Sequence, residues 1–219
     1  MFSQAQYEAV IRELENGTTT LEAKLAEVGP AAHSPTNHWW ITPPAAEAIN
    51  WIAKETVEVG TSILRWIRDL LKGATAPIWM FIDSYRWMDI KGKANGVSTD
   101  LTTQSLIVDD THWSGTARDA YLAAAGAQST SAARIGSIAG NTTGYLLGCA
   151  AAGLGFYIVL AGVLAKLIAA TVAAIAAFGS AVFSWAGAAI VLEEASVNTG
   201  IIVTATSTLA LFLGAQPQP

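Results

Sequence analysis

The feature that most constrains this chain is an apolar tract at residues 135–192, which runs for 58 residues with one charged side chain, Lys166. A membrane-spanning helix needs only about 20 apolar residues. The tract therefore holds two candidate spans, residues 145–165 and 167–192. In a two-span hairpin, Lys166 and Trp185 are expected at the membrane interface, where amphipathic side chains keep their polar ends wet.

The place where the chain reverses is open on the sequence alone. The segment around Lys166 contains no turn residue, so the reversal fits equally at residues 179–180, after one very long helix. That alternative favours a soluble protein in which the tract forms a buried core hairpin wrapped by amphipathic helices. Residues 201–213 are too few to span hydrocarbon and are expected to be a core, re-entrant or interfacial segment.

Charge is distributed very unevenly. Residues 1–134 hold 26 of the 29 charged side chains, so the remainder needs lipid or protein to cover it. The net charge of −5 comes without a Lys/Arg cluster, which argues against nucleic acid as a partner because phosphate neutralisation supplies most of that affinity. The first thirty residues lack the pattern of a cleaved secretory signal, so we expect any export to use another route.

Apolar periodicity predicts three helices before the tract. The first, at residues 4–28, is polar with one apolar stripe, either continuous or broken at residues 16–17, and it ends at residues 29–30. A loop follows through residue 44, in which the tryptophan pair at 39–40 must dock.

The second predicted helix, residues 45–72, is strongly amphipathic and either packs on another helix or lies on a membrane surface. It is broken by Gly73 and Pro77. The third runs over residues 78–108 and stops before Asp109 and Asp110, which would oppose the helix dipole.

A Trp-Ser-Gly turn, Trp113, Ser114 and Gly115, follows this helix. Glycine supplies the freedom of a tight reversal, and the spacing of Thr116 and Asp119 is typical of a capping box that restarts a helix. Trp113 is expected to fill the space between the two helices.

At this turn the chain resembles the WXG family of type VII secretion substrates, which are helix-turn-helix hairpins with this tripeptide in the turn. The resemblance covers roughly residues 78–145. It implies export by a mycobacterial or actinobacterial type VII apparatus without a cleaved signal, as a helical dimer or larger assembly.

Small residues recur at every fourth position in the following helix. Each glycine inside a helix costs about 1 kcal/mol relative to alanine, and close backbone packing is the usual return. We therefore predict a helix-packing or assembly face; the alternative is that an Ala/Gly-rich composition produces the spacing. The residues are Ala132, Gly136, Gly140, Gly144, Gly148 and Ala152.

The sequence contains little evidence for catalysis or for metal or cofactor binding. Asp109, Asp110 and His112 gather where a metal site is the alternative to a solvated turn, and His33 and His38 share a loop. The lone cysteine, Cys149, has no charged neighbour in sequence and is expected to pack as a small hydrophobe. No phosphate loop, Cys-x-x-Cys pair or Gly-x-Ser-x-Gly motif is present. We expect no enzyme activity and no cofactor.

Together these patterns predict an all-α protein, an elongated helical hairpin or bundle with membrane-inserting C-terminal helices. The expected segments are residues 1–44, 45–77, 78–144 and 145–219. The expected function is structural or pore-forming, in a membrane of the cell envelope or after type VII secretion. Lipid, further copies of the chain or a WXG-type helical partner are the expected partners. The alternative is a soluble helical module whose apolar half packs with a co-secreted protein.

Overall fold

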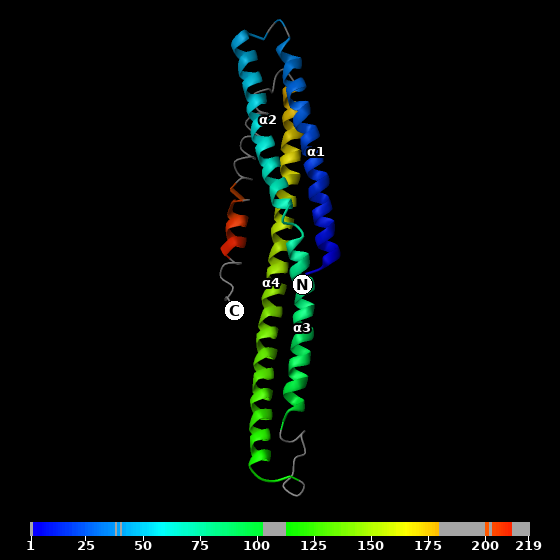
Figure 1. Cartoon of the computed structure of the whole chain (residues 1–219). Helices are drawn as coiled ribbons and strands as arrows, with labels where there is room; N and C mark the ends of the chain where they lie inside the picture. Colours follow the sequence, from blue (N-terminus) through cyan, green and yellow to red (C-terminus); the bar gives the residue numbers. More distant parts are fainter. Residues whose placement is uncertain are drawn as a thin grey trace. The chain divides into compact units, whose positions relative to one another are not determined.

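The computed structural model of the chain is all-α, which confirms the predicted fold class. It describes residues 2–37, 39, 41–102, 113–179, 200–201 and 203–211, and these contain no strand. Residues 200–201 and 203–211 are also helical. The four main helices, labelled in Figure 1, are α1 (Gln4–Thr36), α2 (Pro43–Leu71), α3 (Ala76–Asp100) and α4 (Thr116–Gly179).

The chain divides into two compact units. The hairpin unit is Pro77–Ala151, and the three-helix unit combines Met1–Ala76 with Ala152–Pro219. Helix α4 is 64 residues long and contributes to both. It continues through Lys166 without interruption, so a reversal at Lys166 is wrong; the alternative place, residues 179–180, lies at the edge of the described residues. The residues after Gly179 lie outside the described part until residue 200.

Helix α1 is longer and more regular than the sequence predicts. Of the two alternatives at residues 16–17, the continuous helix is observed, whereas the end expected at residues 29–30 is wrong, because the helix continues to Thr36. Packing overrides the local signals. A Cβ built at Gly17 would lie 2.6 Å from Cδ2 of Leu164, so this glycine is a close contact with α4. After Pro30 the helix continues, and Ala32 is buried in the same core as Val28.

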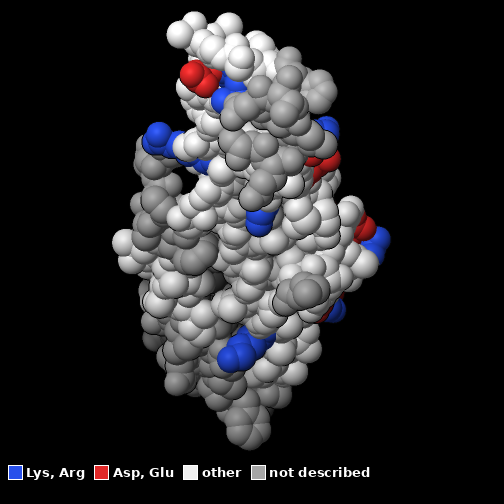
Figure 2. Space-filling model, turned by 90° about the horizontal axis from the view of Figure 1, so that it is seen from below, with Lys and Arg blue, Asp and Glu red and all other residues white. Residues whose placement is uncertain are grey.

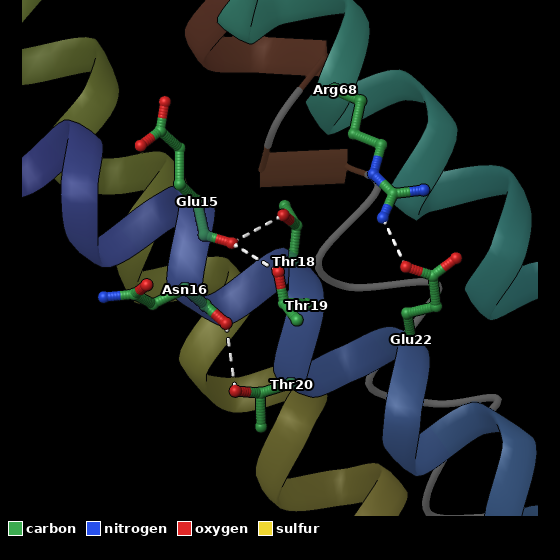
Figure 3. A network of polar contacts seen from close by, with 7 residues as sticks. All are labelled: Glu15, Asn16, Thr18, Thr19, Thr20, Glu22 and Arg68. Atoms are coloured by element: carbon green, nitrogen blue, oxygen red, sulfur yellow. Dashed lines mark hydrogen bonds and ion pairs between the residues drawn. The ribbon is translucent and has the colours of Figure 1, made fainter.

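Three consecutive threonines follow Gly17, and their hydroxyls are satisfied within the helix. Thr18 and Thr19 donate to the carbonyl of Glu15 at 2.8 and 3.2 Å, and Thr20 donates to the carbonyl of Asn16 at 2.9 Å (Figure 3). Such bonds to the preceding turn let threonine occupy a helix interior. Helix α1 therefore continues through the three threonines, although threonine favours a helix only weakly.

Helix α2 is the amphipathic helix that periodicity predicts. Its first residues are prolines, which fit the first helical turn because their missing N–H has no partner there. Of the two roles left open, packing on another helix is confirmed: a Cβ at Gly60 would lie 2.5 Å from Cδ2 of Leu25 in α1. In the loop before it, Trp39 does not dock, since it is 95% exposed, and Trp40 lies outside the described residues.

The core of the three-helix unit joins α1, α2 and the last part of α4. Its apolar side chains come from all three helices and are almost fully buried. Burial of this kind is the main source of stability in a small domain. The cluster consists of Val28, Ala32, Ile49, Ile52, Ala53, Ala170, Ala174 and Phe178.

The hairpin unit pairs α3 with the first part of α4 in antiparallel fashion (Figure 1). Ser129 donates to the carbonyl of Ser98 at 2.8 Å. The Thr143 hydroxyl donates to the carbonyl of Ala139 in its own helix at 2.9 Å and lies 3.4 Å from the carbonyl of Ser84. Helix α3 ends at Asp100, earlier than the predicted residue 108. Asp109, Asp110 and His112 lie outside the described residues.

Candidate functional site

The buried face of α4 follows a seven-residue repeat that the sequence analysis missed. Two positions of each heptad are buried, apart from Ser129 and Leu146, which are half-buried. A seven-residue apolar repeat is the pattern of helices packed side by side along their length. The positions are Ala125, Ser129, Ala132, Gly136, Ala139, Thr143, Leu146, Ala150, Gly153, Tyr157, Leu160, Leu164, Leu167, Thr171, Ala174 and Phe178.

The side chains of this repeat change size between the two units. In the hairpin unit they are mostly Ala, Gly, Ser and Thr, whereas in the three-helix unit they include Tyr157, Leu160, Leu164 and Phe178. The hairpin seam, the buried face of α4 in the hairpin unit, thus consists of small side chains that pack closely and carry little apolar surface. Small residues with interhelical hydrogen bonds are the usual seam of helices in lipid.

The four-residue glycine ladder does not form one packing face within the chain. Ala132 is buried, and a Cβ at Gly136 would collide with the side-chain oxygen of Asn95, while Gly140 lies against the Lys91 side chain. Gly144 is exposed, with no atom within 4 Å of a Cβ built there. Steps of four residues rotate by about 40° around a helix with 3.6 residues per turn, so the ladder leaves the seam.

The last two members of the ladder, Gly148 and Ala152, are half-buried. Ala152 belongs to the three-helix unit and lines a groove of about 320 Å³ there, together with Gly155, Phe156 and Val159 of α4 and with Ala205, Thr208 and Leu209 of the C-terminal helical residues. A role of the outward members in contacts between chains stays a prediction.

The Trp-Ser-Gly turn has the backbone that the sequence predicts, because Gly115 has a φ of +95°. This left-handed conformation is open to glycine and strained for other residues. Trp113 differs from expectation: it is 40% exposed and packs on Tyr121 of α4, at 5.3 Å between ring centroids, rather than being buried between two helices. The aromatic contact is local to the start of α4.

Large apolar side chains of the hairpin unit point outward. Residues more than 39% exposed on α3 include Trp79, Tyr85, Met88 and Val97, and those on α4 include Tyr121, Ile135 and Ile138. With a seam of small residues inside, the hairpin buries little of its own apolar surface. Exposed apolar patches of this kind mark contacts with protein or membrane.

The part of α4 in the three-helix unit has an equally apolar outward face with one charge. We call these exposed residues the outward face of α4: Gly155, Ile158, Val159, Gly162, Ala165, Lys166, Ala169, Val172, Ala173 and Ala176. Lys166 is exposed, and its place at a membrane interface stays a prediction, while Trp185 lies outside the described residues.

Helices α1 and α2 of the three-helix unit are joined by an exposed ion pair. Arg68 of α2 donates to Glu22 of α1 at 2.5 Å (Figure 3). This hydrogen bond and the positive charge of Arg68 hold the pKa of Glu22 below its ordinary value. Charged and apolar surfaces are thus segregated between different helices of one unit.

An aromatic cluster, which sequence analysis also missed, closes the end of α2. Tyr7 of α1 is fully buried and donates to the carbonyl of Ala74 at 2.6 Å, while Tyr157 of α4 donates to the carbonyl of Leu70 at 2.9 Å. The two rings meet edge to face at 5.6 Å. Burial raises the pKa of Tyr7 above its ordinary value, so this hydroxyl stays a donor. We call Phe2, Tyr7, Phe156 and Tyr157 the aromatic clasp.

The residues considered for chemistry are scattered. Within the described ranges, no three His, Cys, Asp or Glu side chains come close enough to hold a metal ion. Cys149 is half-buried, and His33 lies on the α1–α2 surface near Lys54 and Glu58. On the face in Figure 2, the basic side chains are dispersed, and several lie beside acidic ones.

Comparisons with protein families, with curated proteins and with solved structures find no match to this chain. The resemblance to the WXG family therefore depends on the turn and the hairpin themselves.

Proposed function

We propose that this chain is a non-enzymatic helical protein associated with type VII secretion, which assembles and places α4 in a membrane in a structural or pore-forming role. The observation that carries the proposal is the outward face of α4, where Lys166 is the one charge among ten exposed positions. The most apolar 18-residue window of this helix is 44% buried, and the helix is long and apolar enough to cross a membrane.

Only part of α4 fits within hydrocarbon. Its 64 residues extend roughly 95 Å at 1.5 Å per residue, against a hydrocarbon thickness of about 30 Å. Residues 145–165 match that thickness, and Lys166 directly after them would reach the headgroups. The remaining parts of the helix would lie outside the hydrocarbon.

The type VII assignment is supported by the hairpin unit. Two antiparallel helices flank a connection in which Gly115 takes a left-handed conformation directly before α4. The exposed aromatic and aliphatic side chains of this hairpin suit a helical partner, a second copy or a WXG-type protein. The proposal assigns the protein to the cell envelope or to the exported proteins.

A second candidate function is a soluble binding module whose apolar half packs with a co-secreted partner. It is favoured by the burial of α4 against α1 and α2, in which Leu160, Leu164 and Leu167 are at most 2% exposed. In that function, the outward face of α4 contacts protein instead of lipid.

Alkaline carbonate extraction of membranes from cells that produce the full chain separates the two functions. A protein embedded through α4 stays in the pellet, because alkaline washing removes peripheral proteins and leaves spanning helices. Complete recovery in the supernatant, together with purification without detergent, contradicts the membrane function and favours the binding module.

A further inference from the structure

In the three-helix unit, the segment of α4 proposed to enter a membrane is covered on one side by charged helices. Leu164 packs against Gly17 of α1, and the α1 surface carries Glu8, Arg12, Glu13, Glu15, Glu22, Lys24 and Glu27. Charged side chains are strongly disfavoured in hydrocarbon. Helix α4 therefore cannot enter a bilayer while α1 stays against it, and the covered arrangement must open first.

The aromatic clasp is the directional contact that holds this cover. It brings together the start of α1, the end of α2 and the middle of α4, and Tyr7 and Tyr157 are 0% and 6% exposed. Both hydroxyls donate to carbonyls at or just after the end of α2, where a helix leaves carbonyls without intrahelical partners.

Tyr157 also lies well inside residues 145–165, the proposed span. In the covered arrangement its hydroxyl is satisfied by the carbonyl of Leu70. In hydrocarbon the same hydroxyl would lose this partner, and an unsatisfied polar group is unfavourable there. One side chain thus favours the covered arrangement and opposes the inserted one.

We infer that the aromatic clasp is an autoinhibitory contact, which keeps α4 covered by α1 and α2 until its opening releases α4 to lipid. This inference rests on the proposed membrane function. It assigns the control of insertion to Tyr157 and Tyr7. The contact that has to open is the packing of α1 on α4 at Gly17.

The first test measures binding of the full chain to vesicles of phosphatidylcholine and phosphatidylglycerol by flotation, followed by an alkaline wash. For Tyr157→Phe and Tyr7→Phe we expect the inserted-to-free ratio to rise roughly fivefold, the factor that corresponds to one net hydrogen bond. Tyr145→Phe is the matched control, since Tyr145 is an exposed tyrosine of the same helix, and we expect it to insert like the wild type.

The second test locks the cover covalently. A Cβ at Gly17 would lie 3.1 Å from Cγ of Leu164, a separation that suits a disulfide between these positions. We expect Gly17→Cys with Leu164→Cys, in a Cys149→Ala background, to lose insertion when oxidised and to recover it on reduction. The reduced protein controls for the effect of the substitutions on folding.

The outcomes separate the two proposals. If neither the wild type nor Tyr157→Phe inserts, the membrane function fails and the clasp inference fails with it. If the wild type inserts and the oxidised lock inserts equally well, the clasp inference is overturned and the membrane function stands. Insertion of Tyr157→Phe at the wild-type ratio also overturns the inference.

Discussion

At the scale of single residues, the informative glycines are those under close contact rather than those in the four-residue ladder. We expect Gly17→Ala to lower the free energy of unfolding by about 1–3 kcal/mol, because the added methyl group would overpack against Leu164. Gly92→Ala is the control, since nothing lies near a Cβ there, and it should stabilise α3 by up to about 1 kcal/mol through helix propensity. Equal effects of both in urea unfolding would contradict the close contact.

The ion pair between Glu22 and Arg68 gives a second residue-scale prediction. Since the folded protein holds the pKa of Glu22 below its ordinary value, the pair stabilises the fold above the unfolded pKa, about 4.3. This contribution is lost as the pH falls through the folded pKa. We expect Glu22→Gln to be less stable than the wild type near neutral pH and to approach it in acid, measured by urea unfolding at low salt. A difference that grows in acid would contradict the sign.

At the scale of elements, α4 has distinct buried and outward faces, and neighbouring residues test them. We expect Leu160→Ala to lower the free energy of unfolding by about 2–5 kcal/mol, because Leu160 is 1% exposed and its loss leaves a cavity. Ile158→Ala should cost less than about 1 kcal/mol, since Ile158 is 43% exposed. Similar costs at both positions would mean that the outward face is covered in the free protein.

The elements also show what the sequence could predict. The existence of α2 and of a hairpin around Gly115 follows from apolar periodicity and turn chemistry, and both are observed. The continuation of α1 past residues 29–30 does not, and residues 16–17 left two alternatives open, because both points depend on contacts with Leu164 and with a core from three helices. Local breaker residues are a weak signal when tertiary packing opposes them.

At the scale of the whole molecule, the candidate site was harder to predict than the fold. The apolar tract marks α4, and Lys166 is an exposed residue of this helix. Which side of the helix is buried depends on the seven-residue repeat, while the conspicuous four-residue ladder rotates away from the seam at Gly144. The aromatic clasp joins Tyr7 to Tyr157, which are 150 positions apart in the sequence, so no local pattern predicts it.

The exposure of Gly144 makes assembly of the whole molecule testable separately from its folding. A Cβ at this position has no atom of another segment within 4 Å, and leucine raises helix propensity, so we expect Gly144→Leu to leave the free energy of unfolding unchanged or slightly increased. If chains assemble through the outward members of the ladder, the same leucine separates two backbones that must approach closely. Chemical crosslinking of the membrane-bound protein should then lose its oligomers. Gly126→Leu, at another exposed position of α4 with open space, should keep them. Oligomers that survive Gly144→Leu would show that the glycine spacing is compositional and that assembly uses another surface, of which the exposed apolar side chains of the hairpin unit are the next candidate.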